Sequence, residues 1–207
     1  MKKLQKWLPG FLIFAVLLAS LAGGAAYAKY VTQKQFDGSV TIKAELGTIT
    51  LQEHTANRKE DGSYELLTST TDKNEYIIIP GLDIPKDPFV TVTRTSPIPV
   101  YVFIEVVDTI ESENKNVITY TADPANWLKV DGVTGKNGGM VYVYTTNGSA
   151  AAEVTDTVGP INILSNETVY VSQKLKQVTG GVSINFYASM GQVAAGHTPA
   201  EVYQSIT

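Results

Sequence analysis

The chain has no cysteine among its 207 residues, and it has only two histidines, His54 and His197. The absence of cysteine excludes disulfides, thiolate zinc ligands and a cysteine nucleophile. The two histidines lie far apart and neither belongs to an HExxH motif, which argues against a zinc centre. No GxSxG nucleophile elbow occurs either. The sequence thus carries no recognisable catalytic or metal signature, and we expect no cofactor.

Basic residues are also few. The chain has 16 lysines and arginines against 20 aspartates and glutamates, for a formal net charge of −4. Nucleic-acid binding draws most of its affinity from lysine and arginine at phosphates, and this sequence shows no basic stripe that could supply them. We therefore expect no nucleic-acid partner.

The N-terminus has the charge and apolar pattern of a secretory signal peptide. Lys2, Lys3 and Lys6 precede an almost wholly apolar run over residues 8–22. This run is shorter than the roughly twenty residues of a membrane-spanning helix, and small residues follow it in place of a basic stop-transfer cluster. We predict a signal peptide over residues 1–28, with membrane contact only through the uncleaved precursor. The residues that mark the cut are Ala26, Ala28 and Lys29, and cleavage after Ala26 is the alternative.

Export places constraints on the mature chain, residues 29–207. The signal peptide removes three lysines and no acidic residue, which leaves a formal charge of −7 on 179 residues, enough for one domain with a sizeable core. An exported protein without cysteine favours a bacterium that lacks an oxidising periplasm. We expect a protein that is secreted, or held at the cell surface, by a Gram-positive bacterium.

The first part of the mature chain predicts a half-buried strand. Apolar and polar residues alternate over residues 40–46, and the apolar parity shifts after Gly47, which a β-bulge at Gly47 or Thr48 would explain. The apolar positions of this strand, residues 39–51, are Val40, Ile42, Ala44, Leu46, Ile49 and Leu51.

Further short strands follow at roughly ten-residue spacing. Runs rich in β-branched and aromatic residues over 75–81, 88–95 and 99–108 predict three of them, and the run over 99–108 is expected at the centre of the core. Residues 54–74 are polar and are interpreted as a surface excursion in which Asp61-Gly62 joins two short edge strands.

The second half of the chain continues this pattern. Trp127 is expected in the core, the segments KVDG and GKNGG as loops, and Ser165-Asn166 as a turn before the last strands. A capping box at Thr198 to Glu201 predicts a short C-terminal helix. The fold class is therefore all-β, a jelly-roll or Greek-key β-sandwich with one short helix.

Acidic residues offer weak alternatives. Asp83 and Asp87 flank a proline-containing loop without a DxDxDG pattern, so they are interpreted as turn formers in preference to calcium ligands. Glu111 and Glu113 lie in a polar loop and are expected to be solvated rather than paired for glycoside hydrolysis.

Four segments, in order, resemble the TasA and camelysin-like exported proteins of Gram-positive bacteria. They are AYAKY with the GSVTIKAELGTITL strand, PGLDIPKDPFVTVTRTSPIPVYVFIEV, Trp127 with MVYVYTT, and INFYASMGQVAAGHTPAEVY. Together they span most of the mature chain.

The resemblance implies a jelly-roll subunit of extracellular matrix fibres that is processed by a SipW-type signal peptidase. In such a homopolymer the N-terminal strand of one subunit completes the sheet of the next by β-strand addition, a role that suits residues 29–51. The alternative is that this strand pairs within its own domain. Two other functions remain open: a camelysin-like metalloprotease, and a β-sandwich module that binds carbohydrate through exposed tyrosines.

Overall fold

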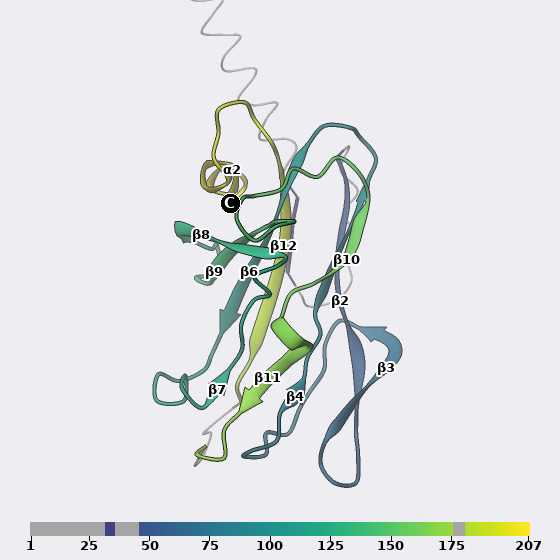
Figure 1. Cartoon of the computed structure of the whole chain (residues 1–207), viewed down its shortest axis with the longest axis vertical. Helices are drawn as coiled ribbons and strands as arrows, with labels where there is room; N and C mark the ends of the chain where they lie inside the picture. The colour runs from purple at the N-terminus through teal and green to yellow at the C-terminus, as the bar shows by residue number, and fades with distance from the viewer. Residues whose placement is uncertain (1–31, 36–45, 176–180) are drawn as a thin grey trace, which may run out of the picture.

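The computed structural model describes residues 32–35, 46–175 and 181–207. These residues form three antiparallel sheets and one short C-terminal helix (Figure 1). The elements are β1 (Thr32–Gln35), β2 (Gly47–Arg58), β3 (Tyr64–Thr71), β4 (Ile84–Pro85), β5 (Phe89–Arg94), β6 (Val100–Asp108), β7 (Ile118–Thr119), β8 (Trp127–Thr134), β9 (Met140–Tyr144), β10 (Val158–Asn162), the 3-10 helix η2 (Ser165–Glu167), β11 (Thr168–Val171), β12 (Ile184–Gln192) and α2 (Pro199–Ile206).

The largest sheet has five strands in the order β1-β12-β6-β9-β8, and β6 lies at its centre. Most of β6 is buried on both faces, as the sequence predicted. Val102 and Ile104 belong to the main core, whereas Phe103 packs on the opposite face against Tyr203 and Ile206 of α2. The helix α2 thus packs on the second face of β6, and therefore successive residues of this strand can be apolar and buried.

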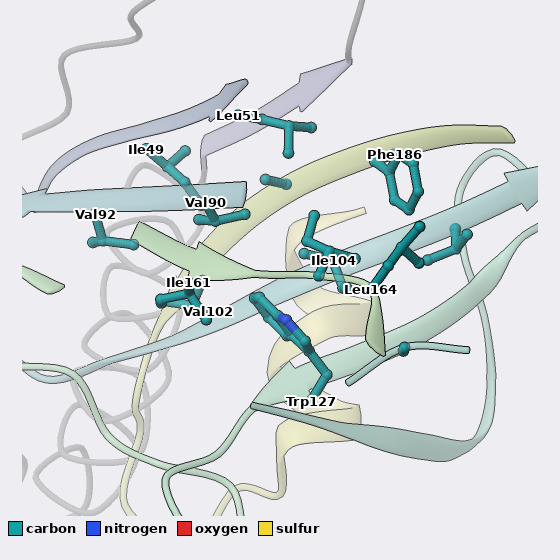
Figure 2. Close-up of a cluster of buried hydrophobic side chains, with 14 of the residues drawn as sticks. Ile49, Leu51, Val90, Val92, Val102, Ile104, Trp127, Ile161, Leu164 and Phe186 are labelled. Atoms are coloured by element: carbon teal, nitrogen blue, oxygen red, sulfur yellow. The ribbon is translucent and has the colours of Figure 1, made fainter. Parts of the chain in front are cut away.

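A second sheet has the order β10-β5-β2-β3 and contributes the other wall of the main core. Strict alternation of buried and half-buried residues begins β2, and Ile49 and Leu51 are on its buried side. Val90 and Val92 of β5 are fully buried opposite them. Figure 2 shows these side chains with Ile104, Phe186 and Trp127, which come from the five-stranded sheet. The apolar faces of the two sheets therefore meet in one core.

The smaller elements close the ends of this core. A three-stranded sheet has the order β4-β11-β7, and η2 makes the turn expected at Ser165-Asn166, with Asn166 at a φ of 55°. Trp127 is 3% exposed, as predicted, and its Nε1–H donates to the Asn162 carbonyl at 2.8 Å. The capping box is present at the start of α2. These local predictions are confirmed.

Three local predictions are wrong. Residues 75–79 form no strand, because their backbone bonds side chains in place of a neighbouring strand: the Ile77 N–H donates to the Tyr64 hydroxyl at 2.7 Å. The KVDG segment belongs to β8, which pairs with β9 and accommodates Gly132 through a register shift. Residues 54–58 continue β2, an interior strand between β5 and β3, although the turn at Asp61-Gly62 does join β2 to β3.

Candidate functional site

The N-terminal segment, from β1 to the start of β2, pairs with both large sheets. Before positions 36–45, β1 lies antiparallel to β12, from Thr32 opposite Met190 to Gln35 opposite Tyr187. After them, β2 pairs with β5, beginning with Gly47 opposite Arg94. The two ends of this segment are therefore held by different sheets.

The candidate assembly residues fall into two groups. The cleavage residues Ala26, Ala28 and Lys29, together with Val40, Ile42 and Ala44, lie outside the described residues. Leu46, Ile49 and Leu51 are 0%, 1% and 4% exposed in the core of their own subunit. The second half of the predicted assembly strand thus pairs within its own domain in this structure.

A glycine and an arginine fix the point where the N-terminal segment enters the domain. Gly47 has a φ of +129°, and a Cβ there would lie 2.1 Å from the Thr93 carbonyl oxygen. Only glycine fits this backbone without strain. The Arg94 guanidinium donates to the carbonyls of Leu46, Ser96 and Ile98. From Gly47 onward β2 pairs with β5 without interruption. The buried positions change from even-numbered at Leu46 to odd-numbered at Ile49, and this change occurs at Gly47, where φ is positive.

One edge of β12 pairs with β6, and β1 of the N-terminal segment pairs with part of the other edge. All nine residues of β12 pair with β6, but only four pair with β1. Phe186, Ala188 and Met190 of β12 point into the main core. An edge of this kind presents backbone donors and acceptors to which another strand can add.

The two histidines have unrelated surroundings. Nδ1 of His54 contacts the carboxylate of Asp87, whose side chain is 7% exposed, and the His54 ring lies 5.4 Å from that of Phe89. His197 lies in the loop before α2 and its Nδ1 is 3.3 Å from the Ala195 carbonyl. Within residues 32–35, 46–175 and 181–207, no three histidine, aspartate or glutamate side chains gather closely enough to hold a metal ion.

The acidic residues considered above bond to different partners. Asp83 accepts the Val171 N–H at 3.1 Å, and Asp87 accepts from His54. Glu111 and Glu113 are both exposed. Asp83 and Asp87 thus bond main-chain groups of strands that are distant in sequence, β11 and β2.

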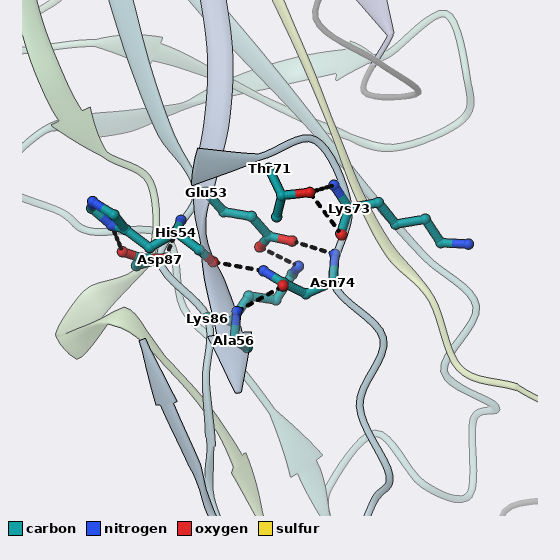
Figure 3. Close-up of polar contacts among 8 residues, drawn as sticks. All are labelled: Glu53, His54, Ala56, Thr71, Lys73, Asn74, Lys86 and Asp87. Atoms are coloured by element: carbon teal, nitrogen blue, oxygen red, sulfur yellow. Dashed lines mark hydrogen bonds and ion pairs between the residues drawn. The ribbon is translucent and has the colours of Figure 1, made fainter. Parts of the chain in front are cut away.

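A buried ion pair joins β2 to the segment before β5. Nζ of Lys86 lies 2.8 Å from Oε2 of Glu53, and the two side chains are 10% and 1% exposed. The main-chain N–H of Asn74 donates to Oε1 of Glu53 at 2.9 Å (Figure 3). The sequence pattern did not predict this cluster, although Glu53 has the same buried parity as Ile49 and Leu51, which is the signal that could have indicated it.

A second buried carboxylate, Glu105, lies in the middle of β6 and is 2% exposed. Its Oε1 accepts the main-chain N–H groups of Asn137 and Gly139, and its Oε2 accepts Nδ2 of Asn137 at 2.9 Å. The hydroxyl of Tyr203 lies 3.4 Å from Oε2. Burial and, next, the charge of Glu105 raise the pKa of Tyr203 to about 12. Glu105 thus fastens the β8–β9 loop and α2 to the central strand.

Comparison with protein-family models, curated proteins and solved structures finds no match to this chain. In the part of the chain that the structure describes, no helix is long and apolar enough to span a membrane.

Proposed function

We propose that this chain is a non-enzymatic extracellular structural protein, a fibre subunit of a biofilm matrix or cell surface that assembles by β-strand donation. The observation that carries the proposal is the pairing of β1 with the outer edge of β12, because it puts N-terminal residues on a sheet edge where a strand can be exchanged. The host is a Gram-positive bacterium that secretes the protein.

The fold supports the resemblance to the TasA and camelysin-like proteins. Two antiparallel sheets share one core, and strands distant in sequence are neighbours, such as β6 beside β12 and β5 beside β10. We interpret this arrangement as a jelly-roll sandwich.

Strand donation would replace β1 on β12 with the N-terminal segment of a neighbouring subunit. The alternating residues Val40, Ile42 and Ala44 supply one apolar face, and main-chain hydrogen bonds to the β12 edge supply affinity. Leu46, Ile49 and Leu51 are buried in their own subunit, so the exchanged part ends before Leu46. Gly47 and Arg94 mark the boundary between the donated segment and the domain.

Cleavage after Ala28 by a SipW-type signal peptidase controls assembly in this proposal. In the precursor the segment from Lys29 is tethered to the membrane through the signal peptide and is not available to a neighbour. Cleavage frees the segment, and self-association follows outside the membrane.

The proposal is tested by N-terminal sequencing and electron microscopy of the same secreted sample. We expect Lys29 as the first residue, fibres from the mature protein, and no fibres after deletion of residues 29–41. Ile42→Asp is expected to reduce fibres strongly, whereas Thr41→Asp, which adds the same charge at the opposite parity, leaves them intact. Fibres that persist in the deletion variant would reject strand donation. Bound zinc with chelator-sensitive proteolysis would support a metalloprotease instead, and specific glycan binding without fibres would support a carbohydrate module.

A further inference from the structure

Two groups from separate segments bond the buried carboxylate of Glu53. Lys86 Nζ bonds one carboxylate oxygen at 2.8 Å and the Asn74 main-chain N–H bonds the other at 2.9 Å (Figure 3). Lys86 comes from the segment before β5, and Asn74 from the segment after β3. Because Asn74 bonds Glu53 through its main-chain N–H, its carboxamide side chain lies in the same neighbourhood as the Lys86 amine and the Glu53 carboxyl group.

The surroundings of this site are apolar and aromatic. Lys86 Nζ lies 5.7 Å from the ring centroid of Tyr76 and 5.7 Å from that of Phe186. Burial, followed by the charges of Glu53 and Asp87, raises the pKa of the Tyr76 phenol above its usual range. In such surroundings the ion pair is less strongly favoured over a neutral amine and a neutral carboxylic acid than it is in water, because burial penalises both charges.

The Asn74 carboxamide is held by the backbone of β2. Its Oδ1 accepts the Ala56 N–H at 2.8 Å, and its Nδ2 donates to the His54 carbonyl at 2.7 Å. A backbone N–H aimed at a carbonyl oxygen polarises the carbonyl and stabilises negative charge that develops there. Cγ of Asn74 is thus prepared for attack by a nucleophile.

We propose that Lys86 and Asn74 form an intramolecular isopeptide bond, with Glu53 as the group that transfers protons. The proposal is independent of fibre assembly, because it concerns a modification inside one subunit.

The reaction balances without an oxidant, a reductant or a cofactor. The Lys86 ammonium gives one proton to Glu53 and becomes a neutral amine, which attacks Cγ of Asn74 as the carbonyl electrons move to Oδ1. Glu53 protonates Nδ2 and accepts a second proton from Nζ. The carbonyl reforms as the Cγ–Nδ2 bond breaks, and Nδ2 leaves as ammonia. Ammonia then removes the proton from Glu53 as ammonium and restores the carboxylate.

The bond would link the segment after β3 to the segment before β5 in an exported chain that has no cysteine. A cross-link of this kind restricts the unfolded chain as a disulfide does, but reducing agents do not break it.

Tryptic mapping of the full-length or secreted folded protein tests the proposal directly. Trypsin cuts after Lys73, Lys86 and Arg94, so the unmodified chain yields peptides 74–86 and 87–94. In the cross-linked chain Lys86 resists cleavage. We expect one peptide over residues 74–94 with the mass of one ammonia missing and no backbone fragments separating Asn74 from Lys86.

Two variants and one control assign the roles. Lys86→Arg keeps the positive charge but removes the nucleophile, and Glu53→Gln removes the proton-transfer group; both are expected to release peptides 74–86 and 87–94 at full mass. Lys129→Arg, an exposed position on β8, is expected to keep the cross-link. Because the primary measurement uses the wild-type chain, poor folding of a variant does not affect it.

Three results would overturn the proposal. The first is recovery of unmodified peptides 74–86 and 87–94 in full from the folded wild-type protein. The second is loss of ammonia with Lys86 still cleaved, which indicates a succinimide at Asn74. The third is a link between Lys86 and the peptide that contains Glu53, with loss of water.

Discussion

Two substitutions of Glu105 are expected to show separately how much its hydrogen-bond acceptors and its negative charge contribute to the free energy of unfolding. Glu105 is 2% exposed and accepts three N–H groups from Asn137 and Gly139 at 2.8 to 2.9 Å. Glu105→Ala leaves these donors without their acceptor. Each lost bond is worth about 1 kcal/mol, and the cavity adds to the loss, so we expect Glu105→Ala to lower the free energy of unfolding by about 3–5 kcal/mol.

Glu105→Gln is the informative comparison. Its carbonyl oxygen can occupy the position of Oε1 and keep both main-chain bonds, to Asn137 and Gly139. The Gln amide nitrogen that replaces Oε2 cannot accept from Nδ2 of Asn137, so this bond and the charge assistance are lost, and we expect a decrease of about 1–2 kcal/mol. The charge of Glu105 also contributes to the raised pKa of Tyr203, so Glu105→Gln should lower that pKa from about 12.

Urea unfolding followed by tryptophan fluorescence measures both variants, because Trp127 is the only tryptophan outside the predicted signal peptide and is buried. Glu113→Gln, an exposed substitution, serves as the control and should stay within about 0.5 kcal/mol of the wild type. Equal losses in Glu105→Ala and Glu105→Gln, or losses as small as the control's, would refute the account of this carboxylate.

Three further predictions concern the ends of elements and the core. Gly47→Ala should destabilise the domain by about 1–3 kcal/mol, because its φ is +129° and its Cβ meets the Thr93 carbonyl, whereas Gly181→Ala, with open space around it, should be nearly neutral in the same urea assay. Hydrogen bonds from Thr198 lower the pKa of Glu201 below its ordinary value of 4.5, so its stabilisation of α2 is complete above that pH and is lost as the pH falls through the lower folded value. The hydrogen-exchange protection factors of the α2 amides, which are corrected for the intrinsic pH dependence of exchange, should therefore fall on acidification, and Glu201→Gln should abolish this fall. Trp127→Phe should cost about 1–3 kcal/mol in calorimetric unfolding, since it leaves the Asn162 carbonyl without its 2.8 Å donor.

Much of the fold was predictable because it depends on local patterns. Alternation of apolar residues identified β5 and the start of β2, and the continuous apolar run identified β6 as the central strand. The capping box at Thr198 fixed the start of α2 without reference to the rest of the chain.

The errors arose where distant residues decide the outcome. Residues 75–79 have strand composition, but Tyr64 and Glu53 capture backbone N–H groups near them, and no neighbouring strand pairs there. Continuation of β2 beyond Glu53 depends on pairing with β3, which a polar sequence does not reveal. The hydrogen-bond partners of Glu53 and Glu105 lie in loops, and the periodicity of apolar residues does not predict where loops lie.

Strand donation is tested most directly by mixing the mature protein with a variant that lacks residues 29–41. This variant keeps β2 and the β12 edge but lacks β1 and most of the donated segment, so it can accept a strand and can offer only residues 42–45 in return. If subunits assemble by strand donation, this variant forms no fibres alone, and small amounts of it shorten wild-type fibres in electron micrographs because it ends each chain to which it adds. Fibres from the variant alone, or wild-type fibres of unchanged length in the mixture, would contradict the account.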